Sequence, residues 1–136
     1  MLNYDLIIIG TGSGNTIITP EYDDLKIAII EKSVFGGTCL NRGCIPSKML
    51  IHVADIVTEI NDSHALGIEV GPPSINWPEI QTRIFGRIDP IATSGEDYRK
   101  TLPNVTVYNG EASFITRHTI KVGNEKISAD HIVIAT

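Results

Sequence analysis

The sequence lacks the features that mark several common classes of protein. Its 136 residues contain no block of five or more like charges, and the net charge is −5, which argues against nucleic acid or an anionic membrane as a partner. The longest apolar runs, such as residues 6–9, have strand length and fall far short of a membrane span. No basic stretch precedes an apolar core at the N-terminus, so no signal peptide is expected and a cytoplasmic protein is predicted.

Cysteine is scarce, since Cys39 and Cys44 are the only two in the chain. The cytosol keeps thiols reduced, which makes a structural disulfide a poor interpretation of the pair. A zinc site needs a second pair of ligands at motif spacing, and the histidines are single, at positions 52, 64, 118 and 131. We therefore expect no metal site and interpret each histidine as structural or exposed.

The two cysteines lie in a segment that reads GGTCLNRGCIPSK over residues 36–48. In a regular helix of 3.6 residues per turn, their spacing would point the side chains about 140° apart, too far for a disulfide. Gly43 relaxes the backbone, and Pro46 cannot donate to the carbonyl of Arg42, which loosens the turn. We interpret Cys39 and Cys44 as a redox-active dithiol; the alternative is a pair of buried small hydrophobic residues.

The residues around the cysteines favour the dithiol. Gly37 and Thr38 suggest a place where the backbone approaches a phosphate, directly ahead of Cys39. A cysteine near a helix N-terminus has its thiolate stabilised by the amide dipoles. Lys48, four residues past Cys44, would add positive charge nearby, the alternative being a solvated surface lysine.

A glycine run near the N-terminus predicts a dinucleotide site. Residues 6–9 are typical of a buried parallel strand, and the run that follows contains Gly10, Gly12 and Gly14. Such glycines let the backbone turn tightly and approach a pyrophosphate. The fingerprint G-x-G-x-x-G has Asn15 at its third glycine position, which predicts less close packing of helix and strand there.

A second apolar run over residues 26–30 ends on Glu31, an acid placed to accept hydrogen bonds from an adenosine ribose. With the first strand and the glycine run it makes a βαβ start, in which Pro20 keeps the helix short or irregular. This order of strand, glycine run, second strand and acid predicts dinucleotide binding. A glycine turn in some other α/β protein is the alternative.

The rest of the chain predicts helices followed by strands. Apolar residues at three- and four-residue steps favour a helix from 45 to 60, and a second helix is predicted over 77–98, which Gly86 and Pro90 can interrupt. Further strands are predicted over residues 105–108, 112–115, 119–122 and 126–135. Because the apolar stretch 130–136 suggests a buried strand at the very end, we expect a fragment of a longer protein.

These motifs resemble the FAD-binding half of the pyridine nucleotide-disulfide oxidoreductases, which include glutathione reductase and dihydrolipoamide dehydrogenase. The resemblance covers the whole chain and is strongest in the cysteine motif. It implies an α/β, Rossmann-like FAD-binding domain of three layers: helices, a parallel sheet and a small antiparallel β-meander. Residues 1–136 would be the N-terminal segment of an FAD/NAD(P)-binding domain, incomplete at its C-terminus, with the NAD(P) and dimerisation domains outside it.

The resemblance also implies a chemistry. NADPH, bound outside this chain, would reduce FAD, and the flavin would pass electrons to the Cys39–Cys44 disulfide. Cys44 would face the flavin as the charge-transfer thiolate, and Cys39 would be the interchange thiol that attacks the substrate. Lys48 would tune the flavin's reactive nitrogen. The residues implied as FAD contacts are Gly10, Gly12, Gly14, Asn15, Glu31, Lys32, Gly37, Thr38, Lys48, Ala112 and Thr136.

Within the family, residues 12–15 and 85–99 most resemble the mycothione reductases, so the implied substrate is a low-molecular-weight disulfide, mycothione. The alternatives are a dihydrolipoamide dehydrogenase, which uses NAD, and a non-catalytic dinucleotide-binding module with structural cysteines. The full-length protein is expected to be a homodimer whose partner subunit supplies a His–Glu acid–base pair. The 136 residues lack that pair and a second glycine loop, so we expect them to be inactive alone.

Overall fold

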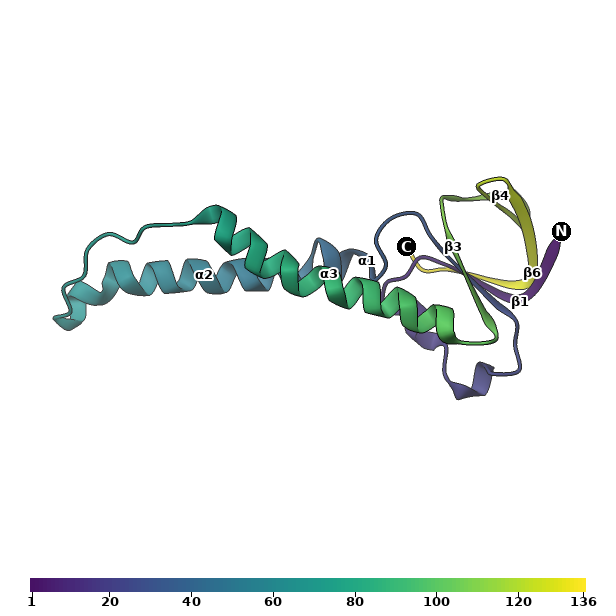
Figure 1. Ribbon diagram of the computed structural model, residues 1–136, viewed down its shortest axis with the longest axis horizontal. Helices are drawn as coiled ribbons and strands as arrows, with labels where there is room; N and C mark the ends of the chain where they lie inside the picture. The colour runs from purple at the N-terminus through teal and green to yellow at the C-terminus, as the bar shows by residue number, and fades with distance from the viewer.

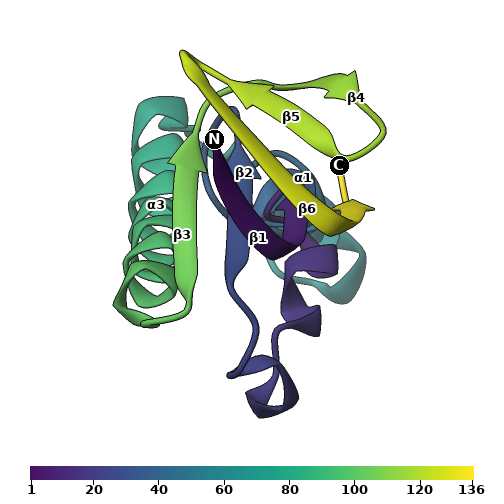
Figure 2. The ribbon, with the colours of Figure 1, turned by 90° about the vertical axis from the view of Figure 1, so that its right-hand side faces the viewer.

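The computed structural model describes all of residues 1–136 and arranges them around one six-stranded mixed sheet. The strands are β1 (Leu2–Ile9), β2 (Ile27–Glu31), β3 (Val105–Asn109), β4 (Ala112–Thr116), β5 (Thr119–Val122) and β6 (Glu125–Ile134). Their spatial order is β3-β2-β1-β6-β5-β4 (Figure 2). Strands β3, β2, β1 and β6 are parallel, and β4, β5 and β6 form an antiparallel meander. The predicted α/β fold, with a parallel sheet and a meander, is confirmed.

Apolar side chains are buried on both faces of the parallel strands. Successive residues of a strand point to opposite faces, so the run over β2 divides between two cores. Ala28 and Ile30 pack with buried residues of β5 and β6, which places the meander over one face. Ile27 and Ile29 pack with Phe35 on the other face, where the helices lie. The sheet is therefore the middle of the three predicted layers.

The helices are α1 (Gly37–Asn41), α2 (Cys44–Asp62) and α3 (Trp77–Thr101), with short 3₁₀ helices at η1 (Ser13–Ile17), η2 (Pro20–Tyr22) and η3 (Ser63–Leu66). The short, irregular helix predicted after the glycine run is confirmed as η1 and η2. At its C-terminal end α3 packs on the sheet, since a Cβ on Gly95 would lie 3.5 Å from the Phe35 ring.

Helix α3 is continuous, so the interruptions considered at Gly86 and Pro90 do not occur. A proline in a helix leaves the carbonyl four residues earlier without its donor and crowds it. Here that carbonyl belongs to Gly86, which is exposed to water and whose absent side chain has open space around it. Asn76 caps the start of α3 by accepting a hydrogen bond from the amide of Glu79 at 3.3 Å.

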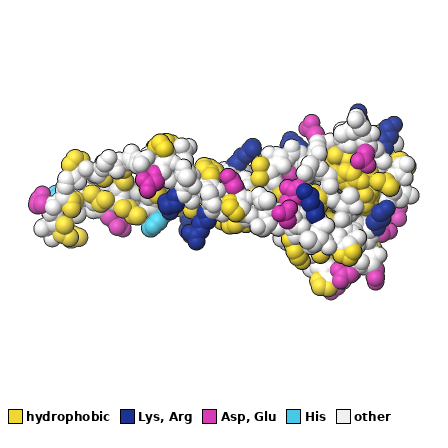
Figure 3. All heavy atoms as spheres, in the orientation of Figure 1, with side chains coloured by type: hydrophobic (Ala, Val, Ile, Leu, Met, Phe, Trp, Pro, Cys, Tyr) yellow, Lys and Arg dark blue, Asp and Glu magenta, His cyan; other side chains and the backbone are white.

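Residues 44–90 form an arm that extends away from the sheet, with α2 and α3 side by side (Figure 1). The predicted helix over 45–60 is confirmed as α2. Several of its apolar residues stay exposed, among them Ile45, Ile51 and Ile56, while others are partly buried. Hydrophobic side chains are visible along the surface of the arm in Figure 3. Neither long helix is apolar enough over a sufficient length to cross a membrane.

The predicted burial of the last strand is wrong in part. Strand β6 ends at Ile134, whose side chain is exposed, as are those of Asp130 and His131. Beyond Ser128 this strand pairs only with β1, because the register of β5 on β6 ends there. One edge of its second half is therefore uncovered.

Candidate functional site

The carboxyl ends of four parallel strands meet at one edge of the sheet. Ile9 lies opposite Ile30 on one side and Ile134 on the other, and Glu31 lies opposite Asn109. The chain leaves β1 toward β2 and returns on the other side of β1 with β6, which makes this edge a topological switch point. Ligands of open α/β sheets bind at such a place. A cleft of about 570 Å³ opens there, a size typical of cofactor sites.

Most of the predicted site residues surround this cleft. Those that line it are Gly10, Gly12, Glu31, Lys32, Gly37, Thr38, Cys39, Ala112 and Thr136. Those that do not line it are Gly14, Asn15, Cys44 and Lys48. Lys48 is exposed on α2. The histidines do not reach the cleft either.

Two glycine loops touch one another in the floor of the cleft. A Cβ on Gly37 would lie 2.5 Å from the Cα of Gly12, far inside van der Waals contact. Gly37 also has φ of +72°, in the left-handed region that other residues rarely adopt. The turn after β1 and the turn before α1 therefore form a single backbone surface, which only the absence of side chains permits.

Asn15 was predicted to weaken the packing of the helix after the glycine run, but the adjacent Gly14 provides a close contact there. A Cβ on Gly14 would lie 2.4 Å from the Cβ of Ala135, so η1 approaches the residues after β6 at this glycine. The prediction of looser packing is therefore wrong. Asn15 is itself buried, and its backbone carbonyl accepts a hydrogen bond from Arg99 Nη2 at 3.0 Å, which ties the glycine run to α3.

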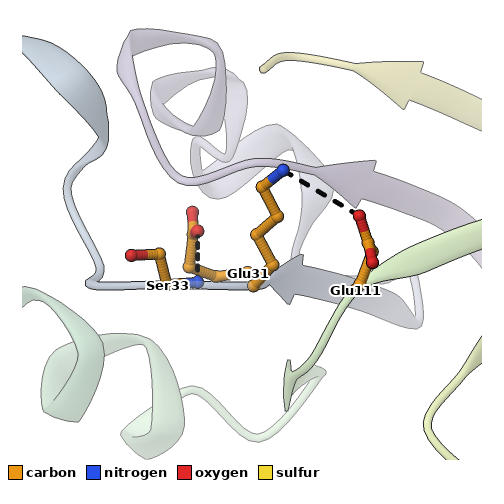
Figure 4. A network of polar contacts seen from close by, with 4 residues as sticks. Glu31, Ser33 and Glu111 are labelled. Atoms are coloured by element: carbon orange, nitrogen blue, oxygen red, sulfur yellow. Dashed lines mark hydrogen bonds and ion pairs between the residues drawn. The ribbon is translucent and has the colours of Figure 1, made fainter.

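Glu31 is held by three donors at the mouth of the cleft. Its Oε1 accepts from the amide of Ser33 at 2.9 Å (Figure 4), while its Oε2 accepts from Thr11 N at 3.1 Å and Thr11 Oγ1 at 2.6 Å. The side chain of Lys32 reaches toward Glu111 across the same space, 4.0 Å apart. Both partners of that pair are largely exposed, so water screens it and it contributes little stability.

The dithiol is built at a break between two helices. Cys39 lies in α1, Cys44 is the first residue of α2, and Arg42 and Gly43 between them are not helical. A Cβ on Gly43 would lie 2.9 Å from Thr38 O and 3.3 Å from Cys39 Cα. The absent side chain thus allows α2 to start close against α1. The irregular backbone predicted between the cysteines is confirmed, because the helix is interrupted at Arg42 and Gly43. Pro46, which cannot donate to Arg42, lies in the first turn of α2, where no donor is needed.

Both thiols are free and exposed, which excludes their interpretation as buried small hydrophobic residues. Hydrogen bonding with Cys44 raises the pKa of the Cys39 thiol above its ordinary value, with a further contribution from desolvation. Cys39 itself lies in the third position of α1, a helix of only five residues. Cys44 is the first residue of the 19-residue helix α2.

Two polar residues of the site were missed from the sequence. The Nδ2 of Asn41 donates to the carbonyls of Phe35 at 2.9 Å and Gly37 at 3.0 Å, and so fastens the second glycine loop to α1. Thr11 joins that loop to Glu31. Asn41 lies inside the cysteine motif, a place that could have drawn attention to it. Thr11 gave no signal, because its partners are 20 and 25 residues away.

Comparison with known proteins gives a consistent result. A mycothione reductase of Mycobacterium tuberculosis is 43% identical, and the alignment covers 99% of this chain and 31% of that protein. A dihydrolipoyl dehydrogenase of Chlamydia trachomatis is 39% identical over 98% of this chain and 30% of its own length. Among solved structures, the Cu(II) complex of the flavoprotein disulfide reductase RclA from Escherichia coli matches with a TM-score of 0.80 and 29% identity, over all of this chain and 29% of that one.

The chain therefore spans about a third of the length of the relatives it matches. The family model described as pyridine nucleotide-disulphide oxidoreductase matches residues 4–136, almost the whole chain, including both glycine loops, Glu31 and both cysteines. Membership of this family implies FAD and a nicotinamide cofactor. The chain belongs to the pyridine nucleotide-disulphide oxidoreductases.

Proposed function

We propose that these residues are the FAD-binding and dithiol-bearing part of a disulfide reductase whose substrate is a low-molecular-weight disulfide, mycothione. One observation carries the proposal: the wall of the cleft continues directly into the dithiol. Gly37, Thr38 and Cys39 are consecutive cleft residues, and Cys44 begins α2 five residues after Cys39, near enough to raise the pKa of the Cys39 thiol. A dinucleotide in the cleft would therefore lie beside a pair of accessible thiols.

The cleft fits the adenosine and pyrophosphate parts of FAD. The joined glycine loops offer backbone amides without side chains at Gly12 and Gly37, which suits a pyrophosphate. Glu31 would accept hydrogen bonds from the adenosine ribose. Bound FAD supplies the two-electron link between a nicotinamide nucleotide and the dithiol. The other proposed contacts are Gly10, Gly14, Asn15, Lys32, Thr38, Lys48, Ala112 and Thr136, of which Gly14 and Asn15 would act by holding the turn.

The reduced dithiol accounts for the chemistry by two exchange steps. The Cys39 thiolate attacks one sulfur of the substrate disulfide, forms a mixed disulfide and releases the first thiol product. The Cys44 thiolate then attacks the Cys39 sulfur, which forms the Cys39–Cys44 disulfide and releases the second thiol. Two electrons leave the chain and the substrate disulfide is reduced. Each turnover thus leaves a Cys39–Cys44 disulfide, whose reduction needs two electrons from a nicotinamide nucleotide.

The raised pKa of Cys39 requires a base, because only the thiolate attacks a disulfide. No histidine of this chain lines the cleft. We therefore propose that the His–Glu pair of a partner subunit, in a cytoplasmic homodimer, removes this proton. Cys44, the first residue of α2, keeps its proposed place on the flavin side.

A substrate panel on the full-length protein tests the proposal. Oxidised mycothione, glutathione disulfide and lipoamide are each offered with NADPH or NADH, and consumption of the nucleotide is followed by absorbance. We expect the highest kcat/KM for mycothione with NADPH. Faster turnover in the lipoamide and NAD direction would instead identify a dihydrolipoamide dehydrogenase, a function to which the 39% identical relative lends support.

Two controls separate the parts of this proposal. The 136 residues alone should show no steady NADPH-dependent turnover, and turnover by them would contradict the proposed need for a partner subunit. Purified holoprotein should contain tightly bound FAD and, after reduction, two titratable thiols that disappear on adding the substrate disulfide. Retention of both thiols with every disulfide offered would favour a non-catalytic dinucleotide-binding module.

A further inference from the structure

Thr11 joins three segments that the sequence keeps apart. Its hydroxyl donates to Glu31 Oε2 at 2.6 Å, at the end of β2, and accepts from the amide of Gly36 at 3.0 Å, in the loop before α1. Thr11 itself lies between the glycines of the first loop. Only 3% of its surface is exposed, although it borders the cleft. Its side chain is thus a buried connection between the two loops and the acid.

The directions of these hydrogen bonds are fixed by chemistry. An amide donates only, so the Thr11 hydroxyl must accept from Gly36 and its single proton must go to Glu31. Glu31 Oε2 also accepts from the backbone amide of Thr11 at 3.1 Å, which leaves that oxygen fully engaged. Glu31 Oε1 accepts only from the amide of Ser33. Oε2 is therefore fully engaged by Thr11, whereas Oε1, which accepts one hydrogen bond, keeps free acceptor capacity.

We propose that Thr11 is a positioning residue for the adenosine ribose of FAD, acting through Glu31. The proposal rests on the proposed function and adds a residue to it. A donor that holds Oε2 fixes the rotation of the carboxylate, so Oε1 is oriented before the ligand arrives. The same hydroxyl fixes Gly36, next to the glycine that would receive the pyrophosphate. Groups fixed in advance lose less freedom on binding, which raises affinity.

The first test measures FAD affinity. The full-length protein, freed of its flavin, is added to FAD, and the quenching of flavin fluorescence is followed. Thr11→Val keeps the shape but removes the hydroxyl, and we expect FAD binding about 10–100-fold weaker, the loss of a hydrogen bond to a charged group. Thr11→Ser keeps the hydroxyl and should bind within about threefold of wild type. Thr16→Val is the matched control, because the exposed Thr16 hydroxyl bonds only to Ser13 O; its FAD affinity should be unchanged.

A ligand analogue distinguishes positioning from a general weakening of the fold. With an FAD analogue whose adenosine lacks the 2′ and 3′ hydroxyls, Glu31 has no ribose hydroxyl to bind. Thr11→Val should then weaken binding much less than it weakens FAD binding. Equal losses for FAD and the analogue, or a Thr11→Ser variant as weak as Thr11→Val, would overturn the proposal.

A measurement without ligand keeps this test separate from the proposed function. Hydrogen exchange at the amide of Gly36 should be at least about tenfold faster in Thr11→Val than in wild type, because that amide loses its acceptor. Thr11→Ala, which cannot overcrowd the site, replaces Thr11→Val if the latter fails to fold. Unchanged exchange would overturn the role of Thr11 even where FAD binds. If exchange is faster in Thr11→Val but the wild-type protein binds no FAD, the proposed function is overturned and Thr11 only holds the loops.

Discussion

The molecule has two regions that differ in how far their apolar residues are buried. One is the head, which comprises the sheet and the segments packed on it (residues 1–43 and 91–136), and the other is the arm (residues 44–90). Ile7, Ile8 and Ile29 of the head are completely buried, whereas Ile51, Ile56 and Ile75 of the arm are about half exposed. The buried residues of the arm are Pro46, Ile84 and Ile88. The head thus has a packed core on each face of its sheet, while the arm consists of two helices that cover little of each other.

This difference explains where the candidate site lies. The cleft is formed at the edge of the rigid sheet, where strand register sets the positions of the loops. Cys44 begins the arm, and Cys39 lies in the wall of the cleft. The dithiol therefore stands where the packed head meets the exposed arm, and its sulfurs are accessible because little packs over that junction.

The largest effect is expected at this junction, and on activity rather than stability. Cys39→Ser removes the attacking sulfur, so turnover of the disulfide substrate by the full-length protein should fall on the order of 10³-fold or more. Because Cys39 is exposed, the free energy of unfolding should change by less than about 0.5 kcal/mol. Turnover assays and urea unfolding measure the two quantities. Substantial remaining turnover would contradict the assigned role.

The next effect separates the head from the arm directly. Ile7→Ala empties part of a fully buried site in the head and should lower the free energy of unfolding by about 2–5 kcal/mol. Ile56→Ala makes the same change in the arm, where 43% of the side chain is exposed, and should change it by less than about 1 kcal/mol. Chemical denaturation of both variants is the measurement. Equal losses would show that the arm is packed as tightly as the head.

The same contrast determines how far the sequence alone could lead. Apolar runs and glycine turns predicted the parallel strands, the meander and both long helices, because these depend on periodicity and local backbone preference. The spacing of Gly12, Glu31 and Cys39 predicted one site, since strand ends of a parallel sheet meet at one edge. Thr11 and Asn41 were missed because they act through hydrogen bonds that form only when the chain is folded.

The failures also have physical causes. The apolar period of α2 predicted the helix correctly, but periodicity does not tell what covers a helix, and Ile45, Ile51 and Ile56 are exposed. Asn15 looked like a defect in the fingerprint because the sequence could not tell that Gly14 packs on Ala135. The raised pKa of Cys39 depends on its closeness to Cys44 at the start of α2, which the residue types alone do not predict.

One substitution made in both regions should have opposite signs. Gly37→Ala places a side chain at φ of +72° and 2.5 Å from Gly12, so the free energy of unfolding should fall by about 1–3 kcal/mol and FAD affinity should fall with it. Gly86→Ala lies in α3, where a Cβ meets nothing within 4 Å. It should raise stability by about 0.5–1 kcal/mol, because alanine favours a helix. Thermal unfolding with and without FAD measures both variants. A destabilising Gly86→Ala would mean that the surface around Gly86 is packed against another part of the protein.

The smallest effect is expected where the arm-bearing helix α3 is tied to the sheet. Glu96 Oε1 accepts from Lys100 Nζ at 2.7 Å and from Asn109 Nδ2 of β3 at 2.9 Å. These two contacts, Lys100 first, lower the pKa of Glu96 below its ordinary value of 4.5. The folded state thus holds this proton less tightly than the unfolded chain. The contacts therefore stabilise the fold above the ordinary pKa and stop doing so as the pH falls through the lowered one.

Glu96→Gln should lower the free energy of unfolding by about 0.3–1 kcal/mol at pH 7, since Glu96 and Lys100 are near solvent. Below the native pKa of Glu96 it should have no effect. Urea unfolding across this pH range is the measurement, with Glu59→Gln on the exposed face of α2 as the control that should show no such dependence. A pH-independent difference for Glu96→Gln would mean that its charge is not what ties α3 to the sheet.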